Sequence, residues 1–169
     1  MNTVEIKKYT KNFKEEVISL ILEIQQKEFE IPISIADQPD LEDVENFYQK
    51  GAGNFWVASI NNTVVGTIAL LDIGNAHGAL RKMFVKKEFR GKDFNIGQRL
   101  LNMLFAWSRE NRLKNIYLGT TEKFLAAHRF YEKNNFIEID KELLPTEFPI
   151  MGVDVKFYEC SISSRFTAL

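Results

Sequence analysis

A strand, a basic turn, a long helix and a second strand follow one another in the middle of the chain, and this order constrains the fold most. The segments "GALRKMFV" and "NIYLGT" have the β-branched and apolar content of strands. Between them, apolar residues recur at helical spacing on one face; these are Ile96, Leu100, Met103, Leu104 and Trp107. Two strands joined by a crossover helix lie parallel in one sheet. The sequence therefore predicts a parallel pair of strands.

The other strand-like segments indicate antiparallel neighbours. "NFWVASI" and "TVVGTIALLD" are separated by "NN", a two-residue turn that tolerates positive φ, and form a predicted hairpin. A second turn at Gly74 and Asn75 leads into "GALRKMFV", and "TVEIKKY", "FIEI" and "VDVKFYEC" are further strands. Helices are expected from Phe13 to near Phe29, from about Leu41 to Tyr48, and in "KFLAAHRFYEKNN". We expect an α+β fold with a mostly antiparallel sheet of about six to seven strands and about four helices on its two faces.

Length and composition limit what this domain binds. The 169 residues, 45% hydrophobic and 27% charged, fit a single domain over 1–169, with a core over about 4–160 and a tail over 161–169. A net charge of -1 gives no general attraction to nucleic acid or membrane. With Cys160 as the only cysteine and two histidines, neither a disulfide nor a metal site is expected. The chain shows no long apolar run, so we expect a cytoplasmic protein, and a homodimer is left open.

The segment "RGKDFNIG" precedes the long helix and has the features of an anion site. A helix start presents unpaired backbone N–H groups and the positive end of the helix dipole, which suit a phosphate. Arg90 and Lys92 add positive charge, and Gly91 and Gly97 allow close backbone approach. Asn95 tolerates the left-handed region and can take the place of a glycine. By itself, the segment is equally compatible with an ordinary turn between a strand and a helix.

Two motifs together resemble the GCN5-related N-acetyltransferase (GNAT) family, and the resemblance covers about Val4 to Tyr158. In that family, a Gln/Arg-x-x-Gly-x-Gly/Ala loop wraps the pyrophosphate of coenzyme A. Here "KDFNIG" places Lys92, Asn95 and Gly97 at its positions. A later family pattern, Asn-x-x-Ala-x-x-Phe/Leu-Tyr-x-x-x-Gly-Phe, is similar to "FLAAHRFYEKNNF". The matches are Ala127, Phe130, Tyr131 and Phe136, with Phe124 at the Asn place and Asn135 at the Gly place.

The resemblance implies the acyl-CoA N-acyltransferase fold and an N-acetyltransferase that uses acetyl-coenzyme A as co-substrate. In that fold the parallel strands splay apart in the middle of the sheet. The arm of the cofactor then lies along the fourth strand, where an amide at a bulge would stabilise the oxyanion. The residues expected to bind the cofactor are Met83, Phe84, Val85, Arg90, Gly91, Lys92, Asp93, Phe94, Asn95, Ile96, Gly97, Gln98, Ala127 and Phe130.

The same resemblance predicts the catalytic groups of a direct attack in a ternary complex. Tyr131 is expected to donate a proton to the coenzyme A thiolate as it leaves. The acceptor amine must lose a proton before it attacks, and His77 is the nearest titratable candidate for this base. A water chain, Asp72, Glu28 or Glu122 are the alternatives.

The acceptor is expected to be a primary amine of a small molecule or peptide. By resemblance, its site lies in "FEIPISIADQPDL" and "KELLPTEFPIMG", whose acidic residues would attract a cationic amine. These acidic residues are Glu28, Glu30, Asp37, Asp40, Glu142 and Glu147. Two other functions stay open: a non-catalytic acyl-CoA-binding sensor or regulatory module of the same fold, and a phosphate-binding protein unrelated to coenzyme A.

Overall fold

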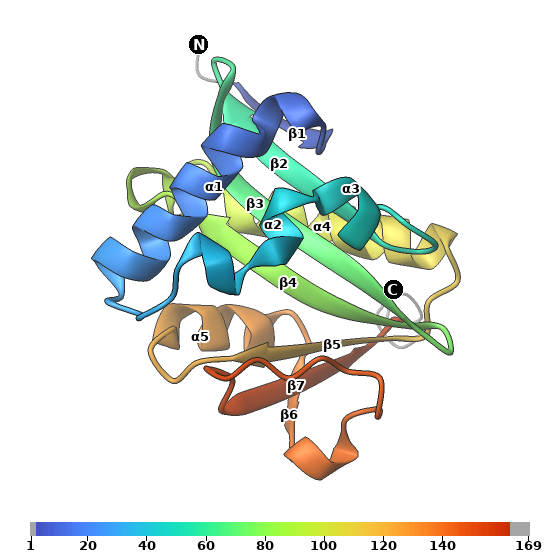
Figure 1. Cartoon of the computed structure of the whole chain (residues 1–169). Helices are drawn as coiled ribbons and strands as arrows, with labels where there is room; N and C mark the ends of the chain where they lie inside the picture. The colour runs from blue at the N-terminus through green and yellow to red at the C-terminus, as the bar shows by residue number, and fades with distance from the viewer. Residues whose placement is uncertain (1–2, 163–169) are drawn as a thin grey trace.

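The computed structural model describes residues 3–162 and shows a seven-stranded sheet (Figure 1). The strand order is β1-β2-β3-β4-β5-β7-β6, and β4 and β5 are its parallel neighbours. The strands are β1 Val4–Lys8, β2 Asn54–Ile60, β3 Thr63–Gly74, β4 His77–Val85, β5 Asn115–Thr120, β6 Ile137–Ile139 and β7 Lys156–Ser161. The predicted fold, a mostly antiparallel sheet with a parallel pair in its middle, is confirmed.

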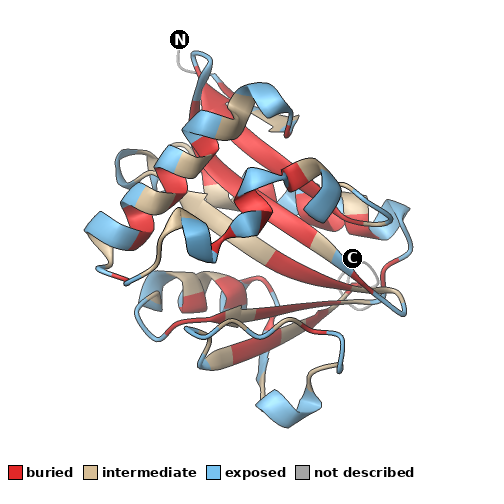
Figure 2. Ribbon diagram, viewed as in Figure 1, coloured by how far each residue is buried: buried red, intermediate tan, exposed pale blue. Residues whose placement is uncertain are grey.

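Helices cover both faces of this sheet. On one face lie α1 (Lys14–Leu22), α2 (Pro39–Glu42) and α3 (Val44–Phe47), and on the other lie α4 (Ile96–Glu110) and α5 (Leu125–Lys133). Successive side chains of β2 point to opposite faces of the sheet and join two different cores. Trp56 and Ala58 pack with α4, whereas Phe55 and Val57 pack with α1. Figure 2 shows that β2 and most of β3 are buried, so the core is centred on them.

Strands β4 and β5 stay paired over a short seam. His77–Ala79 pairs with Asn115–Tyr117, which makes three residue pairs, and beyond Ala79 the two strands separate. β4 continues alongside β3 as far as Val85, and β5 continues alongside β7 as far as Thr120. Each strand therefore keeps one edge without a strand partner in the splay, where backbone groups are open to an extended ligand.

The turns follow the sequence prediction closely. Asn61 and Asn62 have φ of 50° and 62°, so the β2–β3 hairpin has the predicted positive-φ turn. The helix α1 continues as a π-helical segment, η2 (Glu23–Glu28), which ends next to the predicted Phe29.

Two predicted boundaries differ from the structure. The single helix expected from about Leu41 to Tyr48 is two helices of four residues each, α2 and α3, because Asp43 between them is not helical (φ −146°, ψ 62°). Ser161, the first residue of the predicted tail, still belongs to β7, and positions 163–169 lie outside the described residues. Within the described residues, no helix combines the length and apolar character needed to cross a membrane.

Candidate active site

A cavity of about 690 Å³ opens where β4 and β5 separate. Its walls come from the end of β4, the loop before α4, the start of α5, the segment η2, and the loop between β6 and β7. Most residues predicted to bind the cofactor line it: Met83, Phe84, Val85, Arg90, Gly91, Lys92, Asn95, Ile96, Gly97, Gln98, Ala127 and Phe130. Asp93 and Phe94 are not in the lining, and Phe94 packs against Phe89 with ring centroids 5.2 Å apart.

A β-bulge interrupts β4 at this cavity. The register with β3 shifts between Thr67 and Ala69, so Lys82 and Met83 stand opposite one residue of β3. Lys82 has a φ of 51°, and its carbonyl accepts a 2.7 Å hydrogen bond from the Thr67 hydroxyl. The bulge turns the consecutive side chains of Arg81 and Lys82 to one face, toward α2 and α3, where regular alternation would separate them.

The loop before α4 has the backbone conformation expected of a phosphate-binding turn. Gly91 has a φ of 108°, and Asn95, the residue directly before α4, is left-handed with φ 53° and ψ 33°. Asn135, at the second glycine-like place, has a φ of 71°. Both asparagines thus adopt the conformation that replacing a glycine requires, and the first amides of α4 lie at the cavity.

The two cations of this loop have different surroundings. The Arg90 guanidinium forms a bidentate ion pair with Glu28, with 2.7 Å between Nη2 and Oε1, and its Nε donates to the Val85 carbonyl at 2.8 Å. Lys92 is exposed and has no ion-pair partner within residues 3–162. Lys92 therefore keeps its charge available for an anion, whereas Glu28 balances the charge of Arg90.

Side chains from the residues just after η2 and just before α5 meet at the cavity. Phe29 packs edge-on against Phe124 with ring centroids 4.7 Å apart, and Phe124 lies 6.2 Å from the ring of Phe84. Lys123 Nζ donates to the carbonyls of Phe29 and Glu30 at 3.2 and 3.4 Å. Phe124, at the Asn place of the family pattern, therefore gives the cavity an apolar wall in place of an amide.

Tyr131 lines the same cavity from α5. Its side chain is 6% exposed, and its ring lies 5.5 to 6.1 Å from those of Phe130, Phe136 and Tyr158. Burial raises the pKa of Tyr131 well above its ordinary value, so the hydroxyl stays protonated at physiological pH. Such a group can donate a proton to a strong base that forms beside it, and it cannot itself act as the base.

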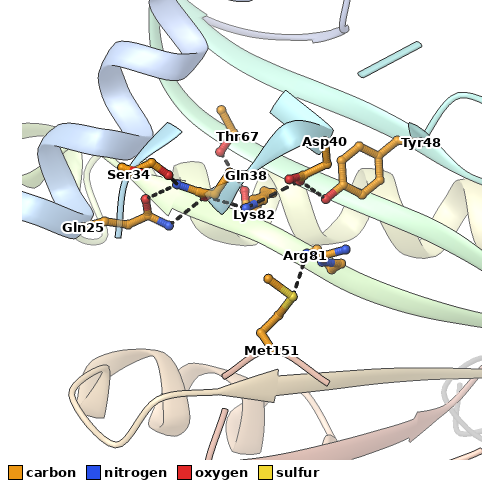
Figure 3. Close-up of polar contacts among 9 residues, drawn as sticks. All are labelled: Gln25, Ser34, Gln38, Asp40, Tyr48, Thr67, Arg81, Lys82 and Met151. Carbon is orange, nitrogen blue, oxygen red and sulfur yellow. Dashed lines mark hydrogen bonds and ion pairs between the residues drawn. The ribbon is translucent and has the colours of Figure 1, made fainter. Parts of the chain in front are cut away.

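A buried polar network holds Lys82, which also lines the cavity (Figure 3). Lys82 Nζ donates to Gln38 Oε1 at 2.5 Å and lies 3.5 Å from Asp40 Oδ2. The Tyr48 hydroxyl donates to the same Asp40 oxygen at 2.6 Å, and Gln25 and Gln38 exchange amide hydrogen bonds of 3.1 and 2.9 Å. Burial lowers the pKa of Lys82 to about 8, while Asp40 acts in the opposite direction. The network compensates the buried charge of Lys82 in part.

Asp154 is the acidic residue in the cavity lining of the described chain. Its Oδ2 accepts a 2.9 Å hydrogen bond from the Met151 backbone N–H, and burial raises its pKa. A Cβ at Gly119 of β5 would lie 2.6 Å from the same oxygen, so this glycine makes room for the carboxylate beside the splayed strand. The acidic residues expected to attract a cationic amine, Glu28, Glu30, Asp37, Asp40, Glu142 and Glu147, do not line the cavity.

His77, the predicted base, lies at the other end of β4. It pairs with Gly74 and Asn115 in the seam, and its ring packs edge-on against Tyr117 with centroids 5.4 Å apart. It is not in the cavity lining. The structure therefore does not bring His77 together with Tyr131.

Comparison with known proteins places this chain in a family. The sequence profile of the acetyltransferase (GNAT) family matches residues 18–136, which is most of the chain. This chain belongs to the GNAT family. A solved GNAT acetyltransferase from Staphylococcus aureus Mu50 is 42% identical, superposes with a TM-score of 0.91, and is matched over 95% of this chain and 99% of that one.

Two further similar proteins differ in how much of their length this chain matches. N-acetylaspartate synthetase from Xenopus tropicalis is 35% identical over 108 residues, which are 62% of this chain and 38% of that protein. PaiA N-acetyltransferase from Thermoplasma acidophilum, solved in complex with coenzyme A, is 20% identical and shares the fold, with a TM-score of 0.75 over 94% of this chain and 99% of that one. The predicted family and the fold are confirmed.

One part of the cavity comes from distant segments and was not predicted from the sequence. Arg81, Lys82, Phe29 and Asp154 all line the cavity. One local signal was available, because the charged pair "RK" inside the strand "GALRKMFV" requires polar surroundings in the middle of a sheet. For Phe29 and Asp154 no local pattern exists, since the fold alone brings η2 and the β6–β7 loop to the cavity.

Proposed function

We propose that this protein transfers the acetyl group of acetyl-coenzyme A to the primary amine of a small molecule or peptide, by direct attack in a ternary complex. The observation that carries the proposal is a single cavity lined by the loop before α4, the edge of β4 and Tyr131. These parts match what acetyl transfer requires. They supply an anion site for the pyrophosphate, an edge for the amide-bearing arm and an acid for the departing thiolate.

In this proposal the donor binds along the loop and β4. Backbone N–H groups from Gly91 to Gln98 bind the phosphates, and Lys92 adds the balancing charge. The arm of coenzyme A pairs with backbone groups of Met83–Val85, on the edge of β4 that β5 leaves without a partner. Arg90 serves the loop indirectly, because its ion pair with Glu28 holds the loop against η2.

The chemistry begins with loss of a proton from the acceptor ammonium, and we assign this proton to the Asp154 carboxylate in place of His77. The amine then attacks the thioester carbon, the C–N bond forms, and a backbone N–H at the Lys82 bulge stabilises the oxyanion. The attached nitrogen loses its second proton to solvent. As the carbonyl re-forms and the C–S bond breaks, Tyr131 gives its proton to the thiolate and regains one from solvent. The thiolate forms in the same apolar surroundings, which raise its basicity as they raise the pKa of Tyr131.

The names of relatives indicate which acceptor to test first. Several vertebrate relatives are N-acetylaspartate synthetases, and the human one is 34% identical over 103 residues. This chain covers 32% of the human protein, so its acceptor is a proposal. We take L-aspartate as the first acceptor and other amino acids, a polyamine and a short peptide as comparisons.

A thiol-release assay with acetyl-coenzyme A, combined with thermal shift, tests the proposal. We expect free thiol to appear in amounts that match acetylated acceptor found by mass spectrometry. We also expect acetyl-coenzyme A to raise the melting temperature more than ATP does. Absence of any shift with acetyl-coenzyme A would contradict the assigned donor site, and an equal shift with ATP would favour a general phosphate-binding protein. A shift without thiol release for any acceptor would favour the non-catalytic acyl-CoA-binding module.

A further inference from the structure

Arg81 projects from β4 into the cavity with most of its hydrogen-bonding capacity unused. Its Nη2 donates to Met151 Sδ at 3.3 Å (Figure 3). Its guanidinium lies over the rings of Phe47 and Tyr48 at 5.7 and 5.9 Å. A thioether is a weak acceptor, and aromatic faces leave the N–H edge of a guanidinium free. Within residues 3–162, Arg81 has no carboxylate partner at ion-pair distance.

The other charged groups near Arg81 do not take up its charge. Lys82, its neighbour on the same face, is also cationic, and Asp40 and Gln38 already bind its Nζ. Asp154 is near enough to interact electrostatically with Arg81, yet it lies beyond ion-pair distance and hydrogen-bonds to Met151. A half-buried guanidinium held in place without an anion is unusual, because removing a charge from water is costly unless it gains a partner.

The position of Arg81 places this charge on the acceptor side of the site. The loop that we assign to the phosphates leads into α4, which covers the opposite face of the sheet from α2 and α3. Arg81 packs against α3 and the loop between β6 and β7, and it directly precedes the bulge where the thioester is proposed to lie. The phosphates of coenzyme A therefore do not account for its charge.

We propose that Arg81 anchors a carboxylate of the acceptor, so the acceptors of this protein are small amino acids and other amines that carry a carboxylate. The inference rests on the proposed acetyltransferase function and names the class of acceptor. A planar guanidinium binds a carboxylate through two parallel hydrogen bonds, and stacking on Phe47 and Tyr48 fixes its orientation beforehand. This proposal replaces the expectation of a cationic acceptor. The acidic residues that were expected to attract such an acceptor lie outside the cavity lining.

Matched pairs of acceptors test this role directly. Each amino acid is compared with its carboxamide in the thiol-release assay, for example glycine with glycinamide and L-aspartate with its two mono-amides. We expect the wild-type protein to prefer the best acid over its amide by at least about tenfold in kcat/KM. In Arg81→Gln this ratio should fall to near one, chiefly through a higher KM for the acid, while the KM for acetyl-coenzyme A stays unchanged. Arg81→Lys should recover only part of the preference, because lysine keeps the positive charge but lacks the two parallel N–H donors of the guanidinium.

Controls separate this role from a structural one. Arg129→Gln removes an exposed arginine outside the cavity and should leave the acid-to-amide ratio unchanged. Loss of packing around Arg81 would lower turnover of acid and amide alike, so the ratio itself reports carboxylate binding. If Arg81→Gln keeps the wild-type preference, or if wild type prefers amides or polyamines, Arg81 is not a carboxylate anchor although the acetyltransferase stands. If no acceptor releases thiol and no acid raises the melting temperature of the coenzyme A complex more than its amide, both proposals fall.

Discussion

The proposed proton donation from the Tyr131 hydroxyl to the thiolate can be tested by removing that hydroxyl. Tyr131→Phe keeps the ring that packs against Phe136 and Tyr158, so the fold should be preserved. Because a positioned general acid contributes roughly 10²-fold or more, we expect kcat to fall by about a hundredfold. The KM for acetyl-coenzyme A should change by less than about threefold, since the hydroxyl acts on the leaving sulfur and not on the phosphates. Steady-state kinetics measure both, and an unchanged kcat would show that the thiolate leaves without this acid.

Lys82 should make the free energy of unfolding depend on pH, and the direction of this dependence can be predicted. Its pKa is lowered from 10.5 to about 8 in the folded protein, so the folded state binds this proton less tightly than the unfolded chain. The free energy of unfolding therefore rises as pH increases from about 8 towards 10.5, as the unfavourable buried charge is lost. Lys82→Met lacks this group and should lack the rise.

Urea unfolding of both proteins at two pH values measures this effect. Relative to Lys82→Met, wild type should gain about 2 kcal/mol between about pH 7 and about pH 9.5, because one pKa unit corresponds to about 1.4 kcal/mol. Other groups titrate in both proteins and cancel in the difference. A difference that stays constant with pH would mean that Lys82 has an ordinary pKa when folded.

Among the elements, the start of α4 makes the clearest prediction. Lys92→Glu places a negative charge beside the amides that we assign to the phosphates, where the helix dipole favours anions. The KM for acetyl-coenzyme A should rise by about tenfold or more, while kcat at saturating donor changes little. Lys87→Glu is the matched control, because Lys87 is exposed in the preceding turn and does not line the cavity. Equal effects of the two substitutions would indicate long-range charge attraction in place of a phosphate contact.

Elements that depend on local chemistry could be predicted from the sequence, and those set by distant contacts could not. Asn61 and Asn62 tolerate positive φ, and they mark the hairpin turn correctly; Asn95 and Asn135 do the same at the ends of α4 and α5. Lys82 also has positive φ, yet nothing in its own sequence favours this conformation. Its carbonyl is bound by Thr67 and its Nζ by Gln38 and Asp40, so tertiary contacts determine the bulge.

In the candidate active site, too, features set by local sequence could be predicted and features set by distant contacts could not. The loop before α4 and Tyr131 could be found because each lies in a continuous motif. Arg81 meets Met151 only after the β6–β7 loop folds back over the sheet, and no local pattern encodes that contact. His77 lies on the same strand as the cavity lining, but in the seam that precedes the splay and outside the lining itself.

Because the splay runs through the middle of the molecule, donor binding should be visible in backbone exchange. If the arm of acetyl-coenzyme A pairs with the open edge of β4, amide hydrogens in Met83–Val85 should exchange more slowly in the complex. Amides of β2, which pairs on both sides with β1 and β3, should change little. Hydrogen-exchange mass spectrometry with and without donor measures this, and protection confined to other segments would contradict the assigned path of the arm.

The short seam between β4 and β5 also concerns the lifetime of the protein in a cell. Three residue pairs join the two strands, so a donor bound in the splay as proposed would act as a missing strand and tie the two parts of the sheet together. A ligand present at a hundred times its Kd stabilises the folded state by about 2.7 kcal/mol, and proteases that cleave opened states act more slowly on such a complex. If acetyl-coenzyme A binds there as proposed, we expect the protein to be degraded sooner when this donor is scarce.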